Sequence, residues 1–446
     1  MIRKETFYAL STPRGVSATA TIRISGPSAL AVISNITKKS KEFFKHKKSI
    51  LLPIYNINND LIDNVIIVTY LSPRSYTGEN MVEVHTHGNP IIIKNLFACL
   101  TENGLRLASP GEFTRVAYLN KKIDLVQAEA TLNLINAKSK AGIEISLNNL
   151  SGSLSQKFIF IRKKLINALA TIEYELDMSE TDNTAQTKKT VLGLVSSSLK
   201  DTKNLIKTYN TSRVLNDGAR IVFVGKPNVG KSTLFNTLLK HDRSIVTDLA
   251  GTTRDTIESV RTISGFSVTL VDTAGIRKTK NPIELAGVNK SLLEIKSADL
   301  IISIFDTLEI DSGFVAPKNK PIISVYNKTD LISGPSLKKL KKNKNVDVCI
   351  SAKRKHGLRE LLELIEKNIE SNLHLAEGFY VTSKRQEEVL LDVAKTLNVL
   401  SDLQLFDLEI FAIEVKEAIN RFNWLLGETT PDDILNEVFS RFCVGK

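Results

Sequence analysis

Residues 225–232, with the sequence Gly-Lys-Pro-Asn-Val-Gly-Lys-Ser, constrain the fold of this chain more than any other segment. They fit the spacing G-x-x-x-x-G-K-[ST], follow the short apolar run Ile221–Val224 and precede a helix-like stretch, Ser232–Leu239. In a strand–loop–helix arrangement, glycines let backbone N–H groups surround a phosphate, and the helix N-terminus adds a positive dipole. We expect Lys231 to reach the β- and γ-phosphates of GTP or ATP and the Ser232 hydroxyl to ligate Mg²⁺.

Three further polar segments each follow a predicted strand, and they decide between the two nucleotides. They are Asp272-Thr273-Ala274-Gly275 after Val268–Val271, Asn327-Lys328-Thr329-Asp330 after Ile322–Tyr326, and Ser351-Ala352-Lys353 after Val346–Ile350. A carboxylate at Asp330 is suited to accept hydrogen bonds from the N1–H and 2-amino group of guanine, a donor pair that adenine lacks. The order of the segments therefore predicts a domain that binds GTP with Mg²⁺ and hydrolyses it.

The residues around the expected γ-phosphate differ from those of Ras-like proteins. Ile276 follows Gly275, where Ras-like proteins have the glutamine that orients water. Arg254 lies in the expected switch, but the sequence assigns it no finger position, so another group must offset the developing charge. A fixed K⁺ is one such group, because Asn228 offers a side-chain carbonyl and the backbone of 247–252 offers more oxygens.

Hydrophobic periodicity divides the chain into regions of three kinds. Residues 1–118 mix β-rich runs (Thr19–Ile24, Val65–Tyr70, Met81–His85) with turns and one helix-like stretch, Ile91–Leu100, which predicts a small α+β domain. Residues 119–214 and 375–446 show helical spacing, and the polar stretch 179–190 is expected to be a loop. Residues 215–374 alternate strand and helix. We expect a multidomain protein, α/β plus all-α, in which a P-loop, Ras-like domain is inserted into a helical one.

Composition limits the cellular setting and the partners. Sixty Lys and Arg against 48 Asp and Glu leave a formal charge of +12, which fits either a nucleic-acid partner or solvated surface lysine. The lysine runs Lys38–Lys48 and Lys338–Lys344 lack the aromatic ladder of single-strand binders. Three widely spaced cysteines give neither a disulfide framework nor a zinc site, and no apolar run reaches the ~18 residues of a membrane span. A cytoplasmic protein without membrane contact is the simplest interpretation.

Several longer segments, together with the phosphate loop, closely resemble the MnmE (TrmE) family of tRNA-modification GTPases. They are Arg23-Ile24-Ser25-Gly26, Ser75-Tyr76-Thr77-Gly78-Glu79, Pro110-Gly111-Glu112-Phe113-Thr114, Leu119-Asn120-Lys121-Lys122-Ile123-Asp124-Leu125, Gln127-Ala128-Glu129-Ala130, Asp248-Leu249-Ala250-Gly251-Thr252-Thr253-Arg254-Asp255, Asp272-Thr273-Ala274-Gly275-Ile276-Arg277 and Phe442-Cys443-Val444-Gly445-Lys446. The resemblance covers essentially the whole chain. The chain departs from the family pattern at residues 12–20 and 86–89.

The resemblance implies a domain plan and partners. It implies an N-terminal tetrahydrofolate-binding and dimerisation domain (1–118), a helical domain in two segments (119–214 and 375–446) and an inserted G domain (215–374). It also implies a homodimer, a heterotetramer with the FAD-containing protein MnmG (GidA), and tRNA as the substrate. The one-carbon donor would be 5,10-methylenetetrahydrofolate or a formyl-tetrahydrofolate analogue.

The resemblance also assigns roles to individual residues. The expected K⁺ ligands are Asn228, Thr247, Leu249 and Thr252, and the expected Mg²⁺ ligands are Ser232 and Thr253. Glu284 falls at the water-orienting position, with Arg254 as a second catalytic candidate. The expected folate contacts are Arg23, Glu83, Lys122 and Lys446. The expected nucleotide-binding residues are Asn228, Val229, Gly230, Lys231, Ser232, Thr233, Thr247, Asp248, Leu249, Ala250, Gly251, Thr252, Thr253, Asp272, Thr273, Ala274, Gly275, Asn327, Lys328, Asp330, Ser351, Ala352 and Lys353.

Two features near the expected folate pocket admit alternatives. Cys443 is either a small buried apolar residue or a thiol near the one-carbon unit. Glu83, His85 and His87 either hold a metal or lie on one face of a strand beside the folate pocket, and we favour the strand.

Two functions are therefore compared. The first is a K⁺-dependent GTP hydrolase that, with an FAD-containing partner, adds an aminomethyl or carboxymethylaminomethyl group at C5 of the wobble uridine of certain tRNAs. The second is a ribosome-assembly or regulatory GTPase switch without one-carbon chemistry. The two helical segments and the terminal Cys-x-Gly-Lys favour the first.

Overall fold

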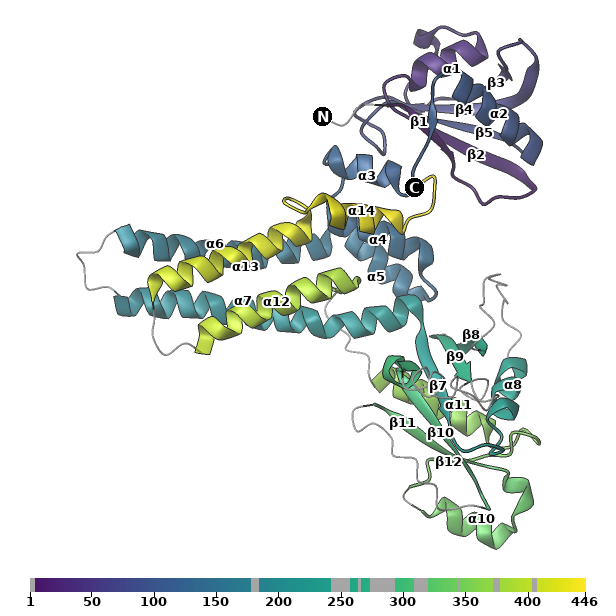
Figure 1. Cartoon of the computed structure of the whole chain (residues 1–446), viewed down its shortest axis with the longest axis vertical. Helices are drawn as coiled ribbons and strands as arrows, with labels where there is room; N and C mark the ends of the chain where they lie inside the picture. Colours follow the sequence, from purple (N-terminus) through teal and green to yellow (C-terminus); the bar gives the residue numbers. More distant parts are fainter. Residues whose placement is uncertain are drawn as a thin grey trace, which may run out of the picture. The chain divides into compact units, whose positions relative to one another are not determined.

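The chain forms two compact units, each containing more than one segment (Figure 1). The first comprises Met1–Leu132, Asn149–Asp201 and Val389–Lys446, and the second comprises Asn133–Asn148 and Thr202–Glu388. The computed structural model describes residues 5–177, 184–241, 257–263, 266–272, 293–308, 320–343, 345–371, 378–402 and 407–446.

A six-stranded sheet with the order β3-β4-β5-β2-β1-β6 forms the N-terminal part of the first unit. Its pairs are antiparallel except for β1 with β6. The strands are β1 (Phe7–Leu10), β2 (Ser17–Ser25), β3 (Ser49–Tyr55), β4 (Leu61–Tyr70), β5 (Met81–Gly88) and β6 (Arg106–Leu107), with helices α1 (Ala29–Thr37) and α2 (Pro90–Glu102) and the 3-10 turn η1 (Lys41–Phe43). The three predicted strands and the predicted helix are confirmed, and β1, β3 and β6 are additional.

The two faces of this sheet differ in chemistry because side chains alternate along a strand. Ile22 and Ile24 of β2 and Val82 and Val84 of β5 are buried in one core with residues of α1 and α2. The intervening residues point to the opposite face, where Arg23 lies directly across from Glu83 in the β2–β5 register. Helices therefore cover one face, and the other is left for polar side chains.

Long helices form the rest of the first unit, and three of them also contribute residues to the second. They are α3 (Glu112–Leu119), α4 (Leu125–Asn136), α6 (Ser153–Asp177), α7 (Thr184–Asp217), α12 (Lys384–Asp402), α13 (Leu408–Leu426) and α14 (Asp432–Ser440). Helices α6 and α13 lie side by side (Figure 1), and the ring centroids of Phe158 and Phe422 are 6.1 Å apart. The predicted helical texture of both segments is confirmed.

The predicted loop at 179–190 is wrong from residue 184 onward, because α7 begins at Thr184. Ala, Gln and Lys have good helix propensity, so a polar composition does not exclude a helix. Packing against α6 adds to this, since the buried Thr187 hydroxyl donates to the Glu175 carboxylate at 2.9 Å. The polar residues of this stretch therefore indicate the exposed surface of a helix, not a loop.

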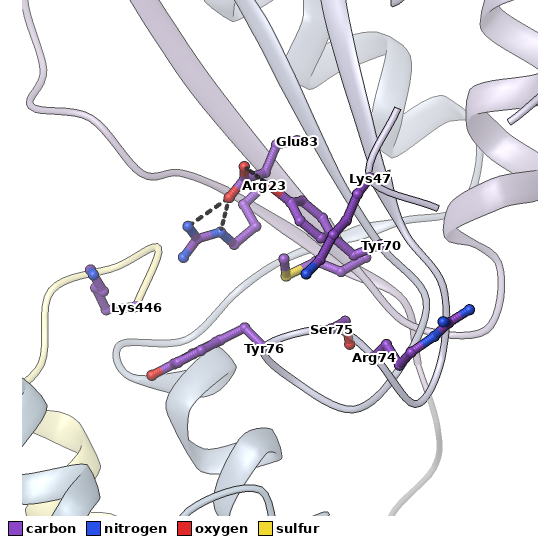
Figure 2. A pocket seen from close by; sticks show the side chains of 9 residues that line it. Arg23, Lys47, Tyr70, Arg74, Ser75, Tyr76, Glu83 and Lys446 are labelled. Carbon is purple, nitrogen blue, oxygen red and sulfur yellow. Dashed lines mark hydrogen bonds and ion pairs between the residues drawn. The ribbon is translucent and has the colours of Figure 1, made fainter. Parts of the chain in front are cut away.

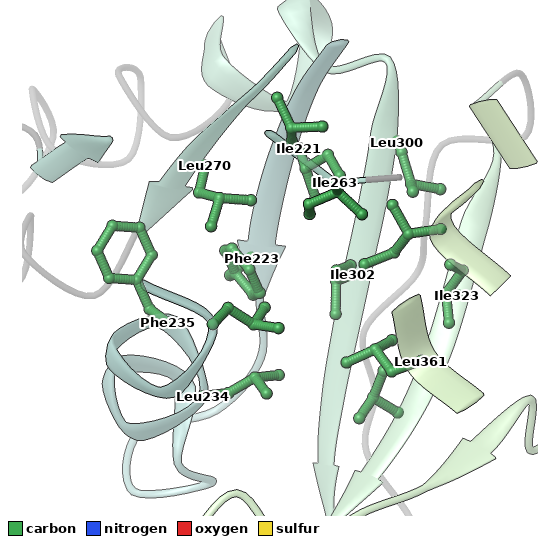
Figure 3. Close-up of a cluster of buried hydrophobic side chains, with 14 of the residues drawn as sticks. Ile221, Phe223, Leu234, Phe235, Ile263, Leu270, Leu300, Ile302, Ile323 and Leu361 are labelled. Carbon is green, nitrogen blue, oxygen red and sulfur yellow. The ribbon is translucent and has the colours of Figure 1, made fainter. Parts of the chain in front are cut away.

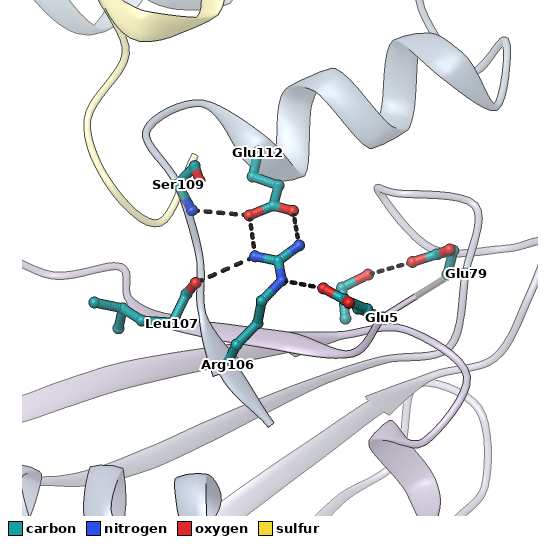
Figure 4. A network of polar contacts seen from close by, with 7 residues as sticks. Glu5, Glu79, Arg106, Leu107, Ser109 and Glu112 are labelled. Atoms are coloured by element: carbon teal, nitrogen blue, oxygen red, sulfur yellow. Dashed lines mark hydrogen bonds and ion pairs between the residues drawn. The ribbon is translucent and has the colours of Figure 1, made fainter. Parts of the chain in front are cut away.

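The segment containing Pro110-Gly111-Glu112-Phe113-Thr114 joins β6, α3 and the C-terminal residues. The guanidinium of Arg106 donates to Glu5 (Nε to Oε2, 2.7 Å) and to Glu112 (Nη1 to Oε2, 2.9 Å), which fixes α3 on the sheet (Figure 4). Gly111 has a φ of +69°, and a Cβ there would lie 2.5 Å from the Phe439 carbonyl oxygen. Glycine at this position therefore lets the C-terminal segment pack closely, which brings Lys446 to the open face of the sheet.

A second six-stranded sheet, with the order β12-β11-β10-β7-β9-β8, forms the main part of the second unit. All its pairs are parallel except β8 with β9. Side chains from this sheet and from its helices form one hydrophobic core (Figure 3). In it, Leu234 and Phe235 pack on Phe223, and Leu361 packs near Ile302 and Ile323. The elements are α5 (Lys140–Leu150), β7 (Ala219–Val224), α8 (Lys231–His241), β8 (Ile257–Ile263), β9 (Phe266–Asp272), β10 (Leu300–Asp306), β11 (Ile322–Asn327), η3 (Thr329–Leu331), α10 (Gly334–Lys341), β12 (Val348–Cys349) and α11 (Leu358–Ser371).

Candidate functional site

The predicted nucleotide residues come together because they follow parallel strands. The loop 225–230 follows β7, Asp272 ends β9, Asn327 ends β11, and Ser351 follows β12. Carboxyl ends of parallel strands lie at one edge of a sheet, which is where open α/β sheets bind ligands. Four segments far apart in the sequence therefore line one edge.

The phosphate loop is shaped for backbone N–H groups to surround an anion. Asn228 and Gly230 have φ values of 64° and 97°, in the left-handed region. A Cβ at Gly230 would lie 2.2 Å from Asn327 Nδ2, so this position requires glycine. The buried Lys231 ammonium donates to the carbonyls of Gly225 (2.9 Å) and Lys226 (2.6 Å). The Lys231 ammonium thus lies within the predicted phosphate-binding loop.

Ser232 and Asp272 form an oxygen-rich contact beside this loop. The Ser232 hydroxyl donates to Asp272 Oδ2 at 2.8 Å, and the Asp272 side chain is buried. A hydroxyl and a carboxylate at this place are the donor types by which P-loop proteins hold Mg²⁺. The residues present therefore fit the metal that the sequence predicts.

Asn327 connects the phosphate loop with the segment after β12. Its Nδ2 donates to the Val229 carbonyl at 2.9 Å, and its Oδ1 accepts the Ala352 N–H at 3.0 Å. All three groups are buried, so each of these hydrogen bonds replaces contact with water. The sequence alone placed Asn327 among nucleotide-binding residues; its packing role depends on two segments that only the fold brings together.

Asp330, the predicted base-reading carboxylate, is held by neighbouring side chains. The Ser351 hydroxyl donates to Asp330 Oδ1 at 2.6 Å, and Arg354 Nε lies 3.8 Å from Oδ2. The hydrogen bond from Ser351 lowers the pKa of Asp330, and the charges of Arg354 and Lys353 act in the same direction. The carboxylate is therefore ionised at neutral pH and available as an acceptor.

Part of the predicted nucleotide site lies outside the described residues. This part comprises both catalytic candidates and most of the switch, namely Thr247, Asp248, Leu249, Ala250, Gly251, Thr252, Thr253, Arg254, Thr273, Ala274, Gly275 and Glu284. Their assigned roles stay predictions. Lys328, which is described, forms an ion pair with Asp306 at 2.6 Å and has a φ of 67°, so it braces the loop before Asp330.

A second candidate site is a pocket of about 380 Å³ on the open face of the N-terminal sheet (Figure 2). Three of the four predicted folate contacts line it together. Four cationic side chains and one carboxylate contribute to its wall, so its net charge is positive. The lining residues are Arg23, Lys47, Tyr70, Arg74, Ser75, Tyr76, Met81, Glu83 and Lys446.

Arg23 and Glu83 form the central pair of this pocket. Arg23 donates to Glu83 Oε1 from Nη2 (2.7 Å) and Nε (3.1 Å), and Tyr70 donates to Glu83 Oε2 at 3.2 Å. Burial raises the pKa of Tyr70, and the neighbouring Glu83 charge raises it further. Glu83 is thereby held as an acceptor by two donors from β2 and β4.

The C-terminal residues close the pocket on one side. Arg23 Nη1 donates to the Gly445 carbonyl at 3.2 Å, which places Lys446 beside the Arg23–Glu83 pair. Burial lowers the pKa of Lys446, and the charge of Arg23 adds to this effect. Two segments more than 400 residues apart thus contribute to one site.

The other residues predicted near this pocket lie outside its lining. Lys122 Nζ donates to the Pro73 carbonyl at 3.1 Å. His85 bonds Thr21, and His87 contacts Asp63 at 2.8 Å, both from β5. Glu83, His85 and His87 thus lie on one strand, as the favoured interpretation expects, but neither histidine lines the pocket. Among the described residues no group of three or more His, Cys, Asp or Glu side chains is arranged to hold a metal.

Cys443 is exposed, so its interpretation as a buried apolar residue is wrong. It lies in the short turn after α14, where its carbonyl accepts the Gly111 N–H at 3.4 Å. Beyond the predicted contacts and the Ser75-Tyr76 pair of the family motif, the pocket is lined by Lys47, Tyr70, Arg74 and Met81. Arg74 directly precedes Ser75-Tyr76-Thr77-Gly78-Glu79, which was the signal available for finding it.

Comparisons with known proteins agree on the family. Family models described as the TrmE N-terminus and the MnmE helical domain match residues 6–122 and 125–443. The tRNA modification GTPase MnmE of Aquifex aeolicus is 39% identical over 452 residues, covering 99% of this chain and 100% of that protein. The same protein of Caldicellulosiruptor saccharolyticus is 36% identical, covering 99% of both chains.

Likeness to solved structures is limited to part of the chain. Aquifex aeolicus Era is 31% identical over 40% of this chain and 66% of that one, but a TM-score of 0.27 is too low to support an argument. No helix among the described ranges is long and apolar enough to span a bilayer. The two family models and the full-length relatives are decisive: this chain belongs to the MnmE (TrmE) family of tRNA modification GTPases.

Proposed function

We propose that this protein is a K⁺-dependent GTPase that, with an FAD-containing partner, adds an aminomethyl or carboxymethylaminomethyl group at C5 of the wobble uridine of certain tRNAs. The observation that carries the proposal is that one chain combines a guanine-nucleotide constellation with a cationic pocket closed by its own C-terminal Lys446. A ribosome-assembly switch needs the first feature and has no use for the second.

The described nucleotide residues support distinct roles in GTP binding. Lys231 would hold the β- and γ-phosphates, Asp330 would read guanine, and Asn327 keeps the two loops together. Ser232, with Asp272 behind it and Thr253 from the switch, would hold Mg²⁺, which neutralises phosphate charge when bound. Glu284 would orient the attacking water in place of the glutamine that Ile276 replaces, and Arg254 is the second catalytic candidate.

A K⁺ site would supply positive charge near the bond that breaks. Asn228 is the described member of its ligand set, and it is exposed in the loop with a left-handed φ of 64°. Thr247, Leu249 and Thr252 would complete the set. Oxygen ligands from an amide and from backbone carbonyls suit a weakly hydrated monovalent cation.

Replacing Na⁺ with K⁺ is expected to raise the rate of GTP hydrolysis at least about 10-fold, because a fixed charge at the developing anion is worth more than ~1.4 kcal/mol. The measurement is phosphate release at constant ionic strength, with Asn228→Ala as the comparison. In that variant the two cations should give similar rates. Equal rates of hydrolysis by the unsubstituted protein in Na⁺ and in K⁺ would contradict the K⁺ site.

The N-terminal pocket fits a tetrahydrofolate donor of a one-carbon unit. Its cationic residues suit the carboxylates of a glutamate tail, and Glu83 suits the N–H edge of a pterin ring. Its volume lies within the range of small-ligand sites. The donor, 5,10-methylenetetrahydrofolate or a formyl analogue, would bring its one-carbon unit near the exposed Cys443 thiol and the terminal residues.

Lys446→Gln is expected to weaken binding of a reduced folate about 10-fold or more, because it removes a partly buried charge from an anion site. Titration calorimetry measures this loss, with the exposed Lys416→Gln on α13 as the matched control. Since burial lowers the pKa of Lys446, folate affinity should also fall as the pH rises through that lowered pKa, and the variant should lack this component. Unchanged affinity in Lys446→Gln would contradict a folate-binding role.

A homodimer through the N-terminal domains is part of the proposal. Strand β3 is an edge of its sheet, and its Leu51 (69% exposed) lies directly opposite Ile66 of β4 (46% exposed). An apolar pair beside an open edge is a feature of protein–protein interfaces. A heterotetramer with MnmG would supply the flavin chemistry.

Mass spectrometry of wobble uridines from cells with and without this protein tests the proposed function. Deletion should leave uridine at the modified position unsubstituted at C5. Intact tRNA modification together with accumulated ribosomal precursors would establish the alternative, a ribosome-assembly GTPase.

A further inference from the structure

Six lysines within eleven residues form a basic segment on the N-terminal domain: Lys38, Lys39, Lys41, Lys45, Lys47 and Lys48. The whole chain has 60 Lys and Arg in 446 residues, so cationic side chains are strongly concentrated here. All six are exposed. Glu42 is the one acidic residue of the stretch. The segment therefore presents a dense positive surface.

The backbone of the basic segment is fixed on the sheet. The Lys47 N–H donates to the Thr69 carbonyl at 2.7 Å, and the Thr69 hydroxyl donates to the Lys45 carbonyl at 2.7 Å. His46 Nδ1 accepts the Leu71 N–H at 3.0 Å, and Phe44 is 3% exposed. The lysine side chains thus project from a pre-organised backbone, which lowers the ordering cost of binding a partner.

These charges are only partly compensated within the described part of the chain, where Glu42 interacts electrostatically with Lys41 and Lys45. None of the six lysines forms an ion pair there, although Lys38 lies 3.9 Å from the centre of the Tyr55 ring. Lys38 and Lys39 follow the end of α1, where a helix dipole favours cations. Lys45 and Lys48 lie outside any helix, and Lys41 and Lys45 share the single carboxylate of Glu42. Mutual repulsion among them is therefore left for an external anion to offset.

The second lysine run, Lys338–Lys344, provides a contrast. Lys338, Lys339 and Lys341 occupy the last turn of α10, where cations complement the dipole of their own helix. These three lysines are as exposed as those of the basic segment. A local structural reason thus accounts for these charges, and they serve as a matched reference for the basic segment.

The basic segment continues into the pocket described above. Lys47 lines that pocket beside Tyr70 and Arg74, as Figure 2 shows. Positive charge therefore runs from the exposed segment to the place where a one-carbon donor would bind. Phe43, which is 41% exposed and lies under the Lys39 ammonium at 5.8 Å, adds an aromatic ring of the kind on which an unpaired base stacks.

We propose that the basic segment binds the phosphate backbone of the substrate RNA next to the one-carbon pocket. The inference rests on the proposed function, since it assigns a surface to the RNA which that function requires. An array of exposed lysines recognises backbone charge rather than sequence. The segment thus positions the RNA, and selection of the uridine is left to other contacts.

Two triple variants test this assignment in the full-length protein. Lys41→Gln, Lys45→Gln and Lys48→Gln together remove three charges from the basic segment and spare Lys47, which lines the pocket. Lys338→Gln, Lys339→Gln and Lys341→Gln together remove three charges from α10. Binding to unmodified tRNA is measured by fluorescence anisotropy over a series of salt concentrations, and GTP hydrolysis and folate binding are measured in parallel.

The first variant should bind tRNA at least about 10-fold more weakly at 0.1 M salt, and its slope of log K against log salt should fall by roughly 2 to 3. Folate binding and basal GTP hydrolysis should be retained, which shows that the domains are folded. The α10 variant should bind tRNA like the parent. Equal tRNA binding by both variants would overturn the inference, as would a defect of the first variant confined to anionic phosphatidylserine vesicles.

The failure of this inference is distinguishable from the failure of the proposed function. If both variants bind tRNA alike while deletion of the protein still removes the wobble modification, the RNA surface lies elsewhere and the function stands. If deletion leaves the modification intact, the proposed function itself is wrong, and with it the reason for assigning RNA to this surface.

Discussion

Asp330→Asn is expected to change the nucleotide preference of this protein from GTP to XTP. Ser351 holds the Asp330 carboxylate, and its hydrogen bond lowers the pKa of that group, so the ionised form accepts from guanine. An amide donates one N–H instead, which matches the 2-oxo group of xanthine and opposes the 2-amino group of guanine. We expect GTP affinity to fall about 100-fold, near 2.7 kcal/mol, with XTP gaining a similar factor.

Competition of GTP and XTP for a fluorescent nucleotide measures this change. Ser351→Ala provides the comparison, because it removes the donor that positions Asp330 and leaves the carboxylate in place. That variant should bind both nucleotides somewhat more weakly and still prefer GTP. A retained GTP preference in Asp330→Asn would show that another residue reads the base.

Lys231→Ala is expected to lower kcat/KM for GTP hydrolysis by about 10³, near 4 kcal/mol. The Lys231 ammonium is buried within the phosphate loop and lies against the carbonyls of Gly225 and Lys226. Bound phosphate oxygens would be its charged partners, and charge is worth more where water is excluded. No neighbouring side chain in the loop sequence can replace a cation at that place, since Lys226 is exposed.

Steady-state phosphate release measures the effect, and thermal unfolding shows whether the loop is still folded. Lys367→Ala, an exposed lysine on α11, removes the same charge at a distance from the loop and should hydrolyse GTP like the parent. Turnover within a few-fold of the parent in Lys231→Ala would contradict the phosphate role of this residue.

The sequence predicted that these segments meet at one edge of the sheet, because its signals are local. Each segment there follows an apolar run, and parallel strands bring their carboxyl ends to one edge without further information. The contact between Ser232 and Asp272 follows from that geometry. The bonds from Asn327 to Val229 and Ala352 were not predicted, because they depend on side-chain orientation after three segments have packed together.

The N-terminal pocket was predictable only through the family resemblance. Arg23, Glu83 and Lys446 are individually ordinary surface charges, and the strand register and the turn at Gly111 bring them together. Polar composition predicted a loop at residues 184–190, where the structure has a helix whose Thr187 packs against α6. In both places the structure depends on contacts between residues that are apart in the sequence. The hydrophobic periodicity of a single sequence does not predict such contacts.

The central claim is that GTP hydrolysis in this chain drives modification of the wobble uridine. The most direct test is mass spectrometry of tRNA nucleosides from cells in which Lys231→Ala is the sole copy of this protein. This variant should be folded and unable to turn over GTP. We therefore expect its wobble uridine to be unmodified, as in the deletion strain. Full modification by the Lys231→Ala protein would contradict the claim.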